Sequence, residues 1–172
     1  MLWFLTYMNK KINLKNKVDV ILVLHNIRST HNVGSLFRSA DGAGVGKIIL
    51  SGYTPAPIDK YGRYRGDIAK TALGAEKSLA WEQADSLPVF LAAIKKQGFF
   101  IAAIEQAKNS VHYKKHNKKS KKIVLILGNE ITGLENEILN LCDQALEIPM
   151  AGNKESLNVS VAGAIVLFDI LT

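Results

Sequence analysis

Polar side chains that could bind a ligand or move a proton gather in three short clusters. These clusters are residues 26–38 (NIRSTHNVGSLFR), 127–133 (LGNEITG) and 148–158 (IPMAGNKESLN). Arg38 offers a fork of N–H donors and Glu130 a carboxylate, with amide and hydroxyl side chains near both in the sequence. Each cluster follows a short apolar run. Because open α/β sheets bind ligands beyond the carboxyl ends of their strands, the three clusters are predicted to meet at one edge.

The first cluster runs into an amphipathic helical pattern. Apolar residues recur with helical spacing at Val33, Leu36, Phe37 and Ala40. Ser29 or Thr30 is placed to cap this helix at its start, and Gly42 and Gly44 are placed to end it. The pattern therefore predicts a helix that packs one face on the core.

The opposite face of this helix is polar. It carries Asn32, Ser35 and Ser39, with Arg38 beside them. An arginine at this position is also compatible with an ordinary helix surface. Gly34, in the first turn, lowers helix propensity by about 1 kcal/mol relative to alanine. We therefore expect another group to approach the backbone closely at Gly34.

The other two clusters combine capping signals with possible site residues. Glu130 either caps a short following helix or presents a carboxylate at the mouth of the sheet. Ser156 or Asn158 is predicted to cap the last helix. A helix N-terminus also offers free N–H donors to a ligand, so capping does not exclude a second role.

Short apolar runs alternate with helical patterns along the chain. Runs typical of strands covered on both faces of a parallel sheet occupy 18–24, 47–50, 99–104, 123–127 and 145–148. A second helix is predicted to bury Val89, Phe90, Ala93 and Ile94. A last helix over 159–171 is apolar nearly all round, which predicts its burial. The alternation predicts a single α/β domain over 19–172, with a parallel sheet, after an N-terminal extension over 1–18.

Two segments interrupt the alternation. Residues 51–81 are rich in proline and glycine, and we expect a long loop there that carries Arg63 and Arg65. Residues 108–122, the lysine-rich segment, hold seven lysines and no carboxylate. Removing these seven from the 22 basic residues leaves 15, which equals the acidic count, so this segment accounts for the net charge of +7. It is predicted to be either an unordered linker or a contact for nucleic-acid phosphates, made by Lys114, Lys115, Lys118 and Lys119.

Composition excludes several classes of protein. With 172 residues, 48% of them hydrophobic, the chain is long enough for one buried core and too apolar to be mainly disordered. The single Cys142 excludes an internal disulfide framework. His25 and His31 have no partners at metal-ligand spacing, so no metal site is predicted. The apolar residues 1–8 match neither a secretory signal nor a membrane span, so we expect a cytoplasmic protein with no membrane partner.

Taken in order, the three clusters resemble the signature motifs of the SpoU/TrmH family of RNA 2′-O-ribose methyltransferases, part of the SPOUT superfamily. Residues 26–40 resemble the first motif through NIRS, NVG and RSA. Residues 127–133 resemble the second through LGNE and a final glycine, and residues 148–160 resemble the third through IPM and SLNVS. The resemblance covers residues 20–171.

The resemblance implies a SPOUT fold with a deep C-terminal trefoil knot, a rare exception among folds. It also implies a homodimer whose active site borrows residues across the interface. The implied cofactor is S-adenosyl-L-methionine, held by residues of the knot loops, namely Leu127, Gly128, Asn129, Ile148, Met150, Leu157 and Asn158.

The implied reaction is methylation of a ribose 2′-hydroxyl in structured RNA. Arg38 is then the catalytic residue, either as a general base or as a bidentate grip on a phosphate that also stabilises the emerging alkoxide. Asn32 would orient the ribose or Arg38, and Glu130 would hold Arg38 or polar groups near the cofactor. Ser156 and Asn158 would line the reacting centre.

Further RNA contacts are expected from Arg28, Arg38, Arg63 and Arg65, in addition to the lysines. Residues 1–18 are too few for the N-terminal RNA-binding domain of many rRNA-directed relatives, which favours tRNA over rRNA. One rival interpretation is a knotted RNA-binding protein without methyl transfer. Another is a doubly wound oxidoreductase, although the glycine run 42–46 (GAGVG) follows a helix and precedes a strand, the wrong order for a dinucleotide fingerprint.

Overall fold

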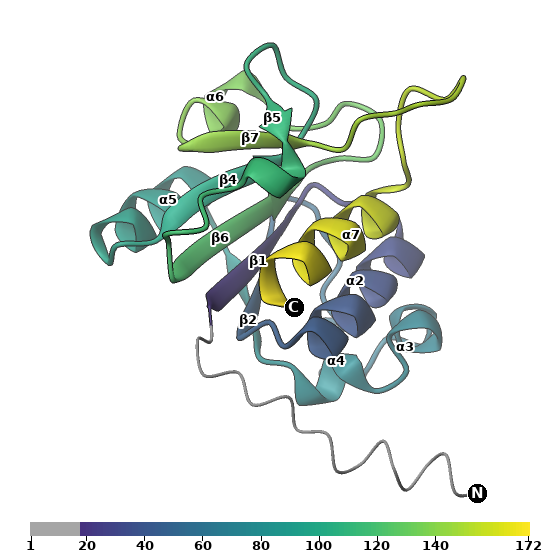
Figure 1. The fold of residues 1–172 in the computed structure, drawn as a ribbon. Helices are drawn as coiled ribbons and strands as arrows, with labels where there is room; N and C mark the ends of the chain where they lie inside the picture. Colours follow the sequence, from purple (N-terminus) through teal and green to yellow (C-terminus); the bar gives the residue numbers. More distant parts are fainter. Residues whose placement is uncertain (1–17) are drawn as a thin grey trace, which may run out of the picture.

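A computed structural model describes residues 18–172, so the predicted N-terminal extension lies outside the described residues except for Val18. Seven parallel strands form one sheet in the order β3-β2-β1-β6-β4-β7-β5 (Figure 1). Their bounds are β1 (Asp19–His25), β2 (Lys47–Ser51), β3 (Trp81–Ala84), β4 (Phe100–Ile104), β5 (Val111–His112), β6 (Lys122–Leu127) and β7 (Gln144–Glu147). The predicted α/β class and parallel sheet are confirmed, and the trefoil knot stays a prediction.

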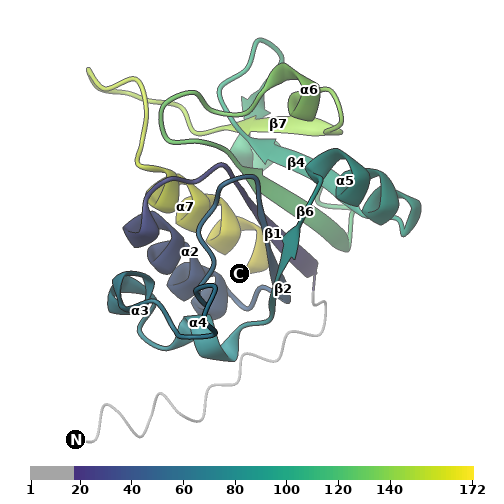
Figure 2. The same ribbon diagram turned by 180° about the vertical axis from the view of Figure 1, so that it is seen from behind.

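Helices cover both faces of this sheet. They are α2 (Thr30–Ala43), α3 (Gly66–Ala72), α4 (Ala75–Ser78), α5 (Leu87–Lys96), the 3-10 helix η1 (Tyr113–Lys115), α6 (Asn136–Leu139) and α7 (Val159–Leu171). Because alternate strand residues point to opposite faces, Leu22 and Leu24 pack with α2, α3 and α7, whereas Ile21 and Val23 pack with α5 and α6. Figure 2 shows the two layers from behind. The sheet thus has a buried core on each side.

The five strands expected from apolar runs are confirmed as β1, β2, β4, β6 and β7. The two strands that the sequence did not indicate, β3 and β5, lie at the two edges of the sheet. β3 (WEQA) is polar at its centre, where Glu82 and Gln83 are exposed, and β5 has only two residues. Edge strands are often short and polar, so they carry little apolar signal.

Helix α2 begins and ends as the sequence predicts. Ser29 caps it by accepting a hydrogen bond from the Asn32 N–H, and Gly44 ends it with φ of 86°. The four predicted core residues, Val33, Leu36, Phe37 and Ala40, are fully buried. The expected close approach at Gly34 is also present: a Cβ there would overlap Thr71 Oγ1 and the Ile68 carbonyl of α3. The approaching group is therefore a neighbouring helix.

Two segments expected to be irregular contain regular structure. The prediction of a long loop over 51–81 is wrong. Helices α3 and α4 form within this segment, and Ile58 pairs with Tyr64 in an antiparallel bridge. The lysine-rich segment, for which an unordered linker was one expectation, contains β5 and η1. It is tied to α7 by His116, whose Nδ1 lies 3.5 Å from Asp169 Oδ2.

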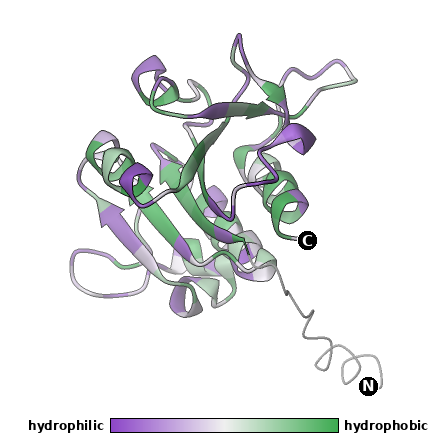
Figure 3. Cartoon of the chain, turned by 60° about the vertical axis from the view of Figure 1, so that its left-hand side comes forward, coloured by the Kyte–Doolittle hydropathy of each residue, from purple (hydrophilic) through white to green (hydrophobic). Residues whose placement is uncertain are grey.

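Two predicted helix faces need correction. Helix α5 buries Leu87, Leu91 and Ile94, whereas Val89, placed on the buried face by the sequence, is 69% exposed. Helix α7, which is mostly apolar in Figure 3, was expected to be buried, but it leaves Val161 and Phe168 exposed (46% and 42%). Within residues 18–172, no helix is both long and apolar enough to cross a membrane.

Candidate functional site

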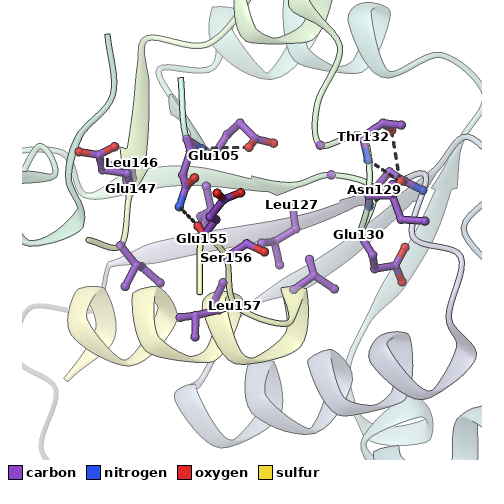
Figure 4. Close-up of a pocket in the computed structure, with 18 of the residues that line it drawn as sticks. Glu105, Leu127, Asn129, Glu130, Thr132, Leu146, Glu147, Glu155, Ser156 and Leu157 are labelled. Atoms are coloured by element: carbon purple, nitrogen blue, oxygen red, sulfur yellow. Dashed lines mark hydrogen bonds between the residues drawn. The ribbon is translucent and has the colours of Figure 1, made fainter. Parts of the chain in front are cut away.

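The loops that follow β4, β6 and β7 meet the segment before α7 around a hollow of about 350 Å³ (Figure 4). This volume lies within the range of small-molecule sites in proteins. The residues expected to bind a cofactor that line this hollow are Leu127, Gly128, Asn129, Ile148, Met150 and Leu157. Ser156 and Glu130 line it too. The structure therefore brings most of the second and third clusters to one cavity.

The lining of the hollow combines apolar side chains with carboxylates. Its acidic residues are Glu105, Glu130, Glu147 and Glu155, and no lysine or arginine among residues 18–172 lines it. Figure 4 shows Leu127 between Glu155 on one side and Glu130 on the other. A phosphate-bearing ligand would be repelled by such a lining, whereas a cationic ligand with an apolar portion is favoured. The hollow thus argues against a dinucleotide and suits a positively charged cofactor.

The loop over 128–133 is held in a tight turn at one side of this hollow. Asn129 and Gly133 exchange backbone hydrogen bonds of 3.1 and 3.0 Å, and Asn129 Oδ1 accepts from the N–H groups of Ile131 and Thr132. A Cβ at Gly128 would lie 2.7 Å from the carbonyl carbon of Gly133, and Gly133 has φ of 67°. Glycine is required at both positions for the loop to fold back on itself.

Glu105 and Gln106 brace the hollow, although the sequence analysis did not select them. Glu105 Oε2 accepts from the Leu134 N–H at 2.9 Å, and Gln106 Nε2 donates to the Glu155 carbonyl at 2.8 Å. Both residues directly follow β4. The rule that ligands bind at the carboxyl ends of strands, applied to this strand as to the others, would have found them.

Glu130 joins the second cluster to the first. Its carboxylate accepts hydrogen bonds of 3.0 Å from the Arg28 N–H, the Ser29 N–H and Asn32 Nδ2. Burial raises the pKa of Glu130. The hydrogen bonds from Arg28, Asn32 and Ser29 together have a larger, opposite effect, so the net pKa lies below its ordinary value. Glu130 is thus held ionised. It does not cap a helix, and within residues 18–172 it makes no hydrogen bond to Arg38.

Asn32 joins the first cluster to the third. Its Oδ1 accepts a hydrogen bond of 3.1 Å from Asn158 Nδ2, while Asn158 Oδ1 caps α7 by accepting from the Ser160 N–H at 2.8 Å. Of the two predicted caps, Asn158 is therefore the one used. Glu130, Asn32 and Asn158 form a continuous hydrogen-bonded chain across all three clusters, which is the convergence that the sequence analysis predicts.

A second hollow adjoins the first on the far side of Glu130. It is lined by Arg28, Ser29, Thr30, His31, Asn32, Asn129, Glu130 and Ile131. Asn129, Glu130 and Ile131 line both hollows and so form the wall between them. Unlike the first hollow, this one carries a cationic side chain, Arg28. The two hollows therefore differ in charge while sharing one wall.

A polar network supports this wall from behind. Asn129 Nδ2 donates to the Asn26 carbonyl at 3.1 Å and to Tyr53 Oη at 2.7 Å. His25 is buried, with Nδ1 2.8 Å from Ser51 Oγ and Nε2 3.2 Å from Glu135 Oε2. No pattern in the sequence indicates His25, Ser51 or Tyr53, because their relevance arises only when β1 and β2 lie side by side.

The predicted arginines are not all brought to the site. Arg38 is exposed on α2, lines neither hollow, and makes no hydrogen bond or ion pair within residues 18–172. Arg63 and Arg65 are instead engaged with carboxylates, at 3.0 Å from Asp59 and 2.9 Å from Asp67. Arg28 alone among the predicted RNA-binding arginines faces a hollow.

Two adjoining hollows at the carboxyl edge of a parallel sheet define an α/β domain that can bring two ligands together. The chain belongs to the family described as the SpoU rRNA Methylase family, which matches residues 19–168. The resemblance seen in the three clusters is thereby confirmed.

Three relatives illustrate the match. The 23S rRNA (guanosine-2′-O-)-methyltransferase RlmB of Vibrio cholerae is 30% identical over 156 residues, which are 90% of this chain and 60% of that protein. The AdoMet-bound rRNA methyltransferase from Sinorhizobium meliloti superposes with a TM-score of 0.80 at 30% identity, over 90% of this chain and 56% of that one. The A. aeolicus TrmH/SpoU tRNA modifying enzyme has a TM-score of 0.77 at 29% identity, over 91% and 76%. The chain thus spans about 60% of the length of its curated RlmB relatives.

Proposed function

We propose that this domain transfers a methyl group from S-adenosyl-L-methionine to a ribose 2′-hydroxyl of RNA. The observation that carries the proposal is the hydrogen-bonded chain of Glu130, Asn32 and Asn158 along the wall between two hollows of different charge. Membership of the SpoU family and the AdoMet-bound relative support the identity of the cofactor. The reaction needs the methyl carbon and the ribose oxygen about 3–3.5 Å apart, so the nucleotide in the second hollow would reach past the shared residues to the methyl group in the first.

The acidic hollow fits this cofactor. S-adenosyl-L-methionine supplies a methyl group that is already activated by its positively charged sulfur. The apolar side chains of Leu127, Ile148, Met150 and Leu157 would hold its uncharged parts, and the ring of carboxylates would favour its positive charges. Gly128 and Asn129 line the same hollow and would contact the cofactor directly.

The second hollow would receive the target nucleotide. Arg28 would contact a phosphate of the RNA, and the Asn32 amide, fixed by Glu130 and Asn158, would orient the ribose. Glu130 acts by positioning, because its carboxylate is taken up by donors from Arg28, Ser29 and Asn32. Ser156 lines the first hollow, and Asn158 would act through its hydrogen bond to Asn32 in the second.

Arg38 would act from a second copy of the chain. It is exposed and lies seven residues after His31, about 10 Å further along α2 and away from the second hollow. Val161 and Phe168 of α7 expose an apolar strip beside α2, and a Cβ at Gly42 would lie 3.7 Å from Phe168 Cζ. We propose that a homodimer covers this strip and that Arg38 reaches the partner's site. Because guanidinium stays protonated, we propose that it grips a phosphate and stabilises the emerging alkoxide.

The proposed substrate is a guanosine of ribosomal RNA. The relatives whose names specify a nucleotide are 23S rRNA guanosine methyltransferases, so the expectation of tRNA is not supported. A tRNA modifying enzyme also superposes on the fold. The test is therefore a comparison of ribose methylation on 23S rRNA, 16S rRNA and tRNA, incubated with the purified chain and S-adenosyl-L-methionine.

The expected result is one new 2′-O-methylated guanosine in rRNA, together with calorimetric binding of the cofactor. If the chain bound the cofactor but methylated only tRNA, the rRNA assignment would be overturned and the proposed reaction would still stand. RNA binding with no cofactor binding would instead establish the alternative, a knotted RNA-binding protein without methyl transfer.

A further inference from the structure

The segment between β2 and α3 forms a small hairpin, residues 57–65, which lines neither hollow. Ile58 and Tyr64 pair in an antiparallel bridge, the Arg65 N–H donates to the Pro57 carbonyl at 2.8 Å, and the Asp59 N–H donates to the Arg63 carbonyl at 2.9 Å. These backbone bonds give a protruding element a defined shape. A protruding hairpin with a defined shape is a common way to present a recognition residue.

The Asp59 carboxylate fixes the tip of this hairpin. Oδ1 accepts from the Tyr61 N–H at 2.8 Å and the Arg63 N–H at 3.0 Å, while Oδ2 accepts from Arg63 Nε at 3.1 Å. Gly62, with φ of 77°, completes the turn by donating its N–H to the Asp59 carbonyl at 3.0 Å. The direction in which residue 61 leaves the backbone is therefore set before any ligand binds.

What the tip presents is the ring of Tyr61. It is 68% exposed, although a tyrosine ring normally buries much of its apolar surface. Lys60 Nζ and Arg63 Cζ each lie over the ring, 5.0 Å from its centroid, so two cations contact the aromatic face. A base that stacks on Tyr61 would displace the Lys60 side chain, which has no ion-pair partner among residues 18–172, and its charge would then lie near the phosphates beside the base.

Charges in the hairpin indicate that stacking, and not phosphate attraction, is its main contribution. Arg63 and Arg65 are paired with Asp59 and Asp67, which leaves Lys60 as the unpaired cation of residues 57–67. By contrast, the lysine-rich segment has seven lysines and no carboxylate. The two surfaces should therefore differ in how salt affects them, because only phosphate neutralisation releases counterions.

We propose that Tyr61, held by Asp59 at the tip of the hairpin 57–65, is a stacking platform for an unpaired base of the RNA substrate. This inference rests on the proposed function, since it requires that the chain bind RNA. It assigns Tyr61 to recognition of exposed bases in loops or bulges, the features by which proteins usually distinguish RNA sites.

The test measures binding of the full chain to two fluorescein-labelled RNAs of equal length by anisotropy. One RNA is a stem with an unpaired loop and the other is a continuous duplex. The variants are Tyr61→Ala, which removes the ring, and Tyr61→Phe, which keeps it. Val89→Ala, an exposed apolar residue of α5 on the other face of the sheet, is the matched control. Each is measured at two salt concentrations.

We expect Tyr61→Ala to weaken binding of the loop RNA about tenfold, which is about 1.4 kcal/mol and within the range for one stacked base. Binding of the duplex, the salt dependence and the affinity for S-adenosyl-L-methionine should not change. Tyr61→Phe should stay within about twofold of the unchanged chain on both RNAs, as should Val89→Ala.

Equal binding of the loop RNA by the unchanged chain and by Tyr61→Ala would overturn the platform while leaving the proposed function intact. An equal loss on loop and duplex RNA would also overturn it, since that result indicates a contact to the backbone. If the unchanged chain bound cofactor but neither RNA, the platform and the RNA substrate would fail together. Normal RNA binding without methyl transfer would refute only the proposed reaction.

Discussion

Two glycines of helix α2 should respond in opposite directions to the same substitution. At Gly34 a new Cβ would overlap the Ile68 carbonyl and Thr71 Oγ1 of α3, and would lie 3.1 Å from the Ala72 nitrogen. At Gly42, in the last turn of the helix, a Cβ would meet Phe168 Cζ at 3.7 Å, an ordinary contact. The pair therefore separates the effect of packing from the effect of helix propensity.

The magnitudes follow from these two effects. Overpacking typically lowers the free energy of unfolding by about 1–3 kcal/mol. Gly34→Ala should lie near the upper value, because the new methyl group would press against backbone atoms of α3 beside the buried Ile68 and Ala72. Alanine gains about 1 kcal/mol of helix propensity over glycine. The net loss for Gly34→Ala is then about 2 kcal/mol. Gly42→Ala keeps the propensity gain alone and should stabilise by about 0.5–1 kcal/mol.

Urea unfolding, followed by circular dichroism at one protein concentration, measures both changes. With a slope of about 2 kcal/mol per molar urea, Gly34→Ala should lower the midpoint by about 1 M and Gly42→Ala should raise it by up to about 0.5 M. A midpoint for Gly34→Ala at or above that of the unchanged chain would refute the reasoning. It would mean that α3 moves aside at no cost and that α2 and α3 are not in fixed contact.

Three further results are expected. Glu130→Gln should lower the free energy of unfolding by about 1 kcal/mol at pH 7, because an acceptor of backbone N–H groups is lost. Folding lowers the pKa of Glu130, so its contribution is present above the unfolded value of about 4.3 and is lost as the pH falls through the folded pKa. The difference in stability between the two proteins should therefore shrink as the pH is lowered below about 4.3. Arg38→Lys should bind S-adenosyl-L-methionine normally in calorimetry yet lose most methyl transfer, because lysine lacks the bidentate fork. Near-normal turnover by this variant would show that Arg38 does not have the proposed role. Changing the lysines of the lysine-rich segment to glutamine should weaken RNA binding and flatten its salt dependence, whereas unchanged titrations would assign that segment to structure alone.

The parts of the fold that could be predicted are those with a continuous apolar signal. The central strands bury both faces, so runs such as 123–127 indicate them without knowledge of their neighbours. β3 and β5 lie at the edges and lack that signal. For α3, only Ile68 and Ala72 are buried, which is too short a pattern to outweigh the surrounding prolines and glycines. For α5, several faces of the segment are apolar, and the choice among them depends on the sheet below.

The site was predictable to the extent that its residues follow predicted strands. Glu130 and Asn158 were selected because they follow β6 and precede the last helix, and the structure places both against Asn32. Two of the three partners of Glu130 were not predictable, because they are backbone N–H groups of Arg28 and Ser29, which almost any residue type would supply. The position of Arg38 outside both hollows depends on its helical phase and on its distance along α2, which the sequence pattern alone does not relate to the hollows.

The order of the elements along the chain determines when each wall of the first hollow is synthesised. All seven strands are complete by residue 147, yet one wall of the hollow comes from residues 148–162. During synthesis from the N-terminus, the sheet can therefore assemble while the hollow still lacks that wall. A molecule that binds only the finished hollow would stabilise the docked final helix by mass action.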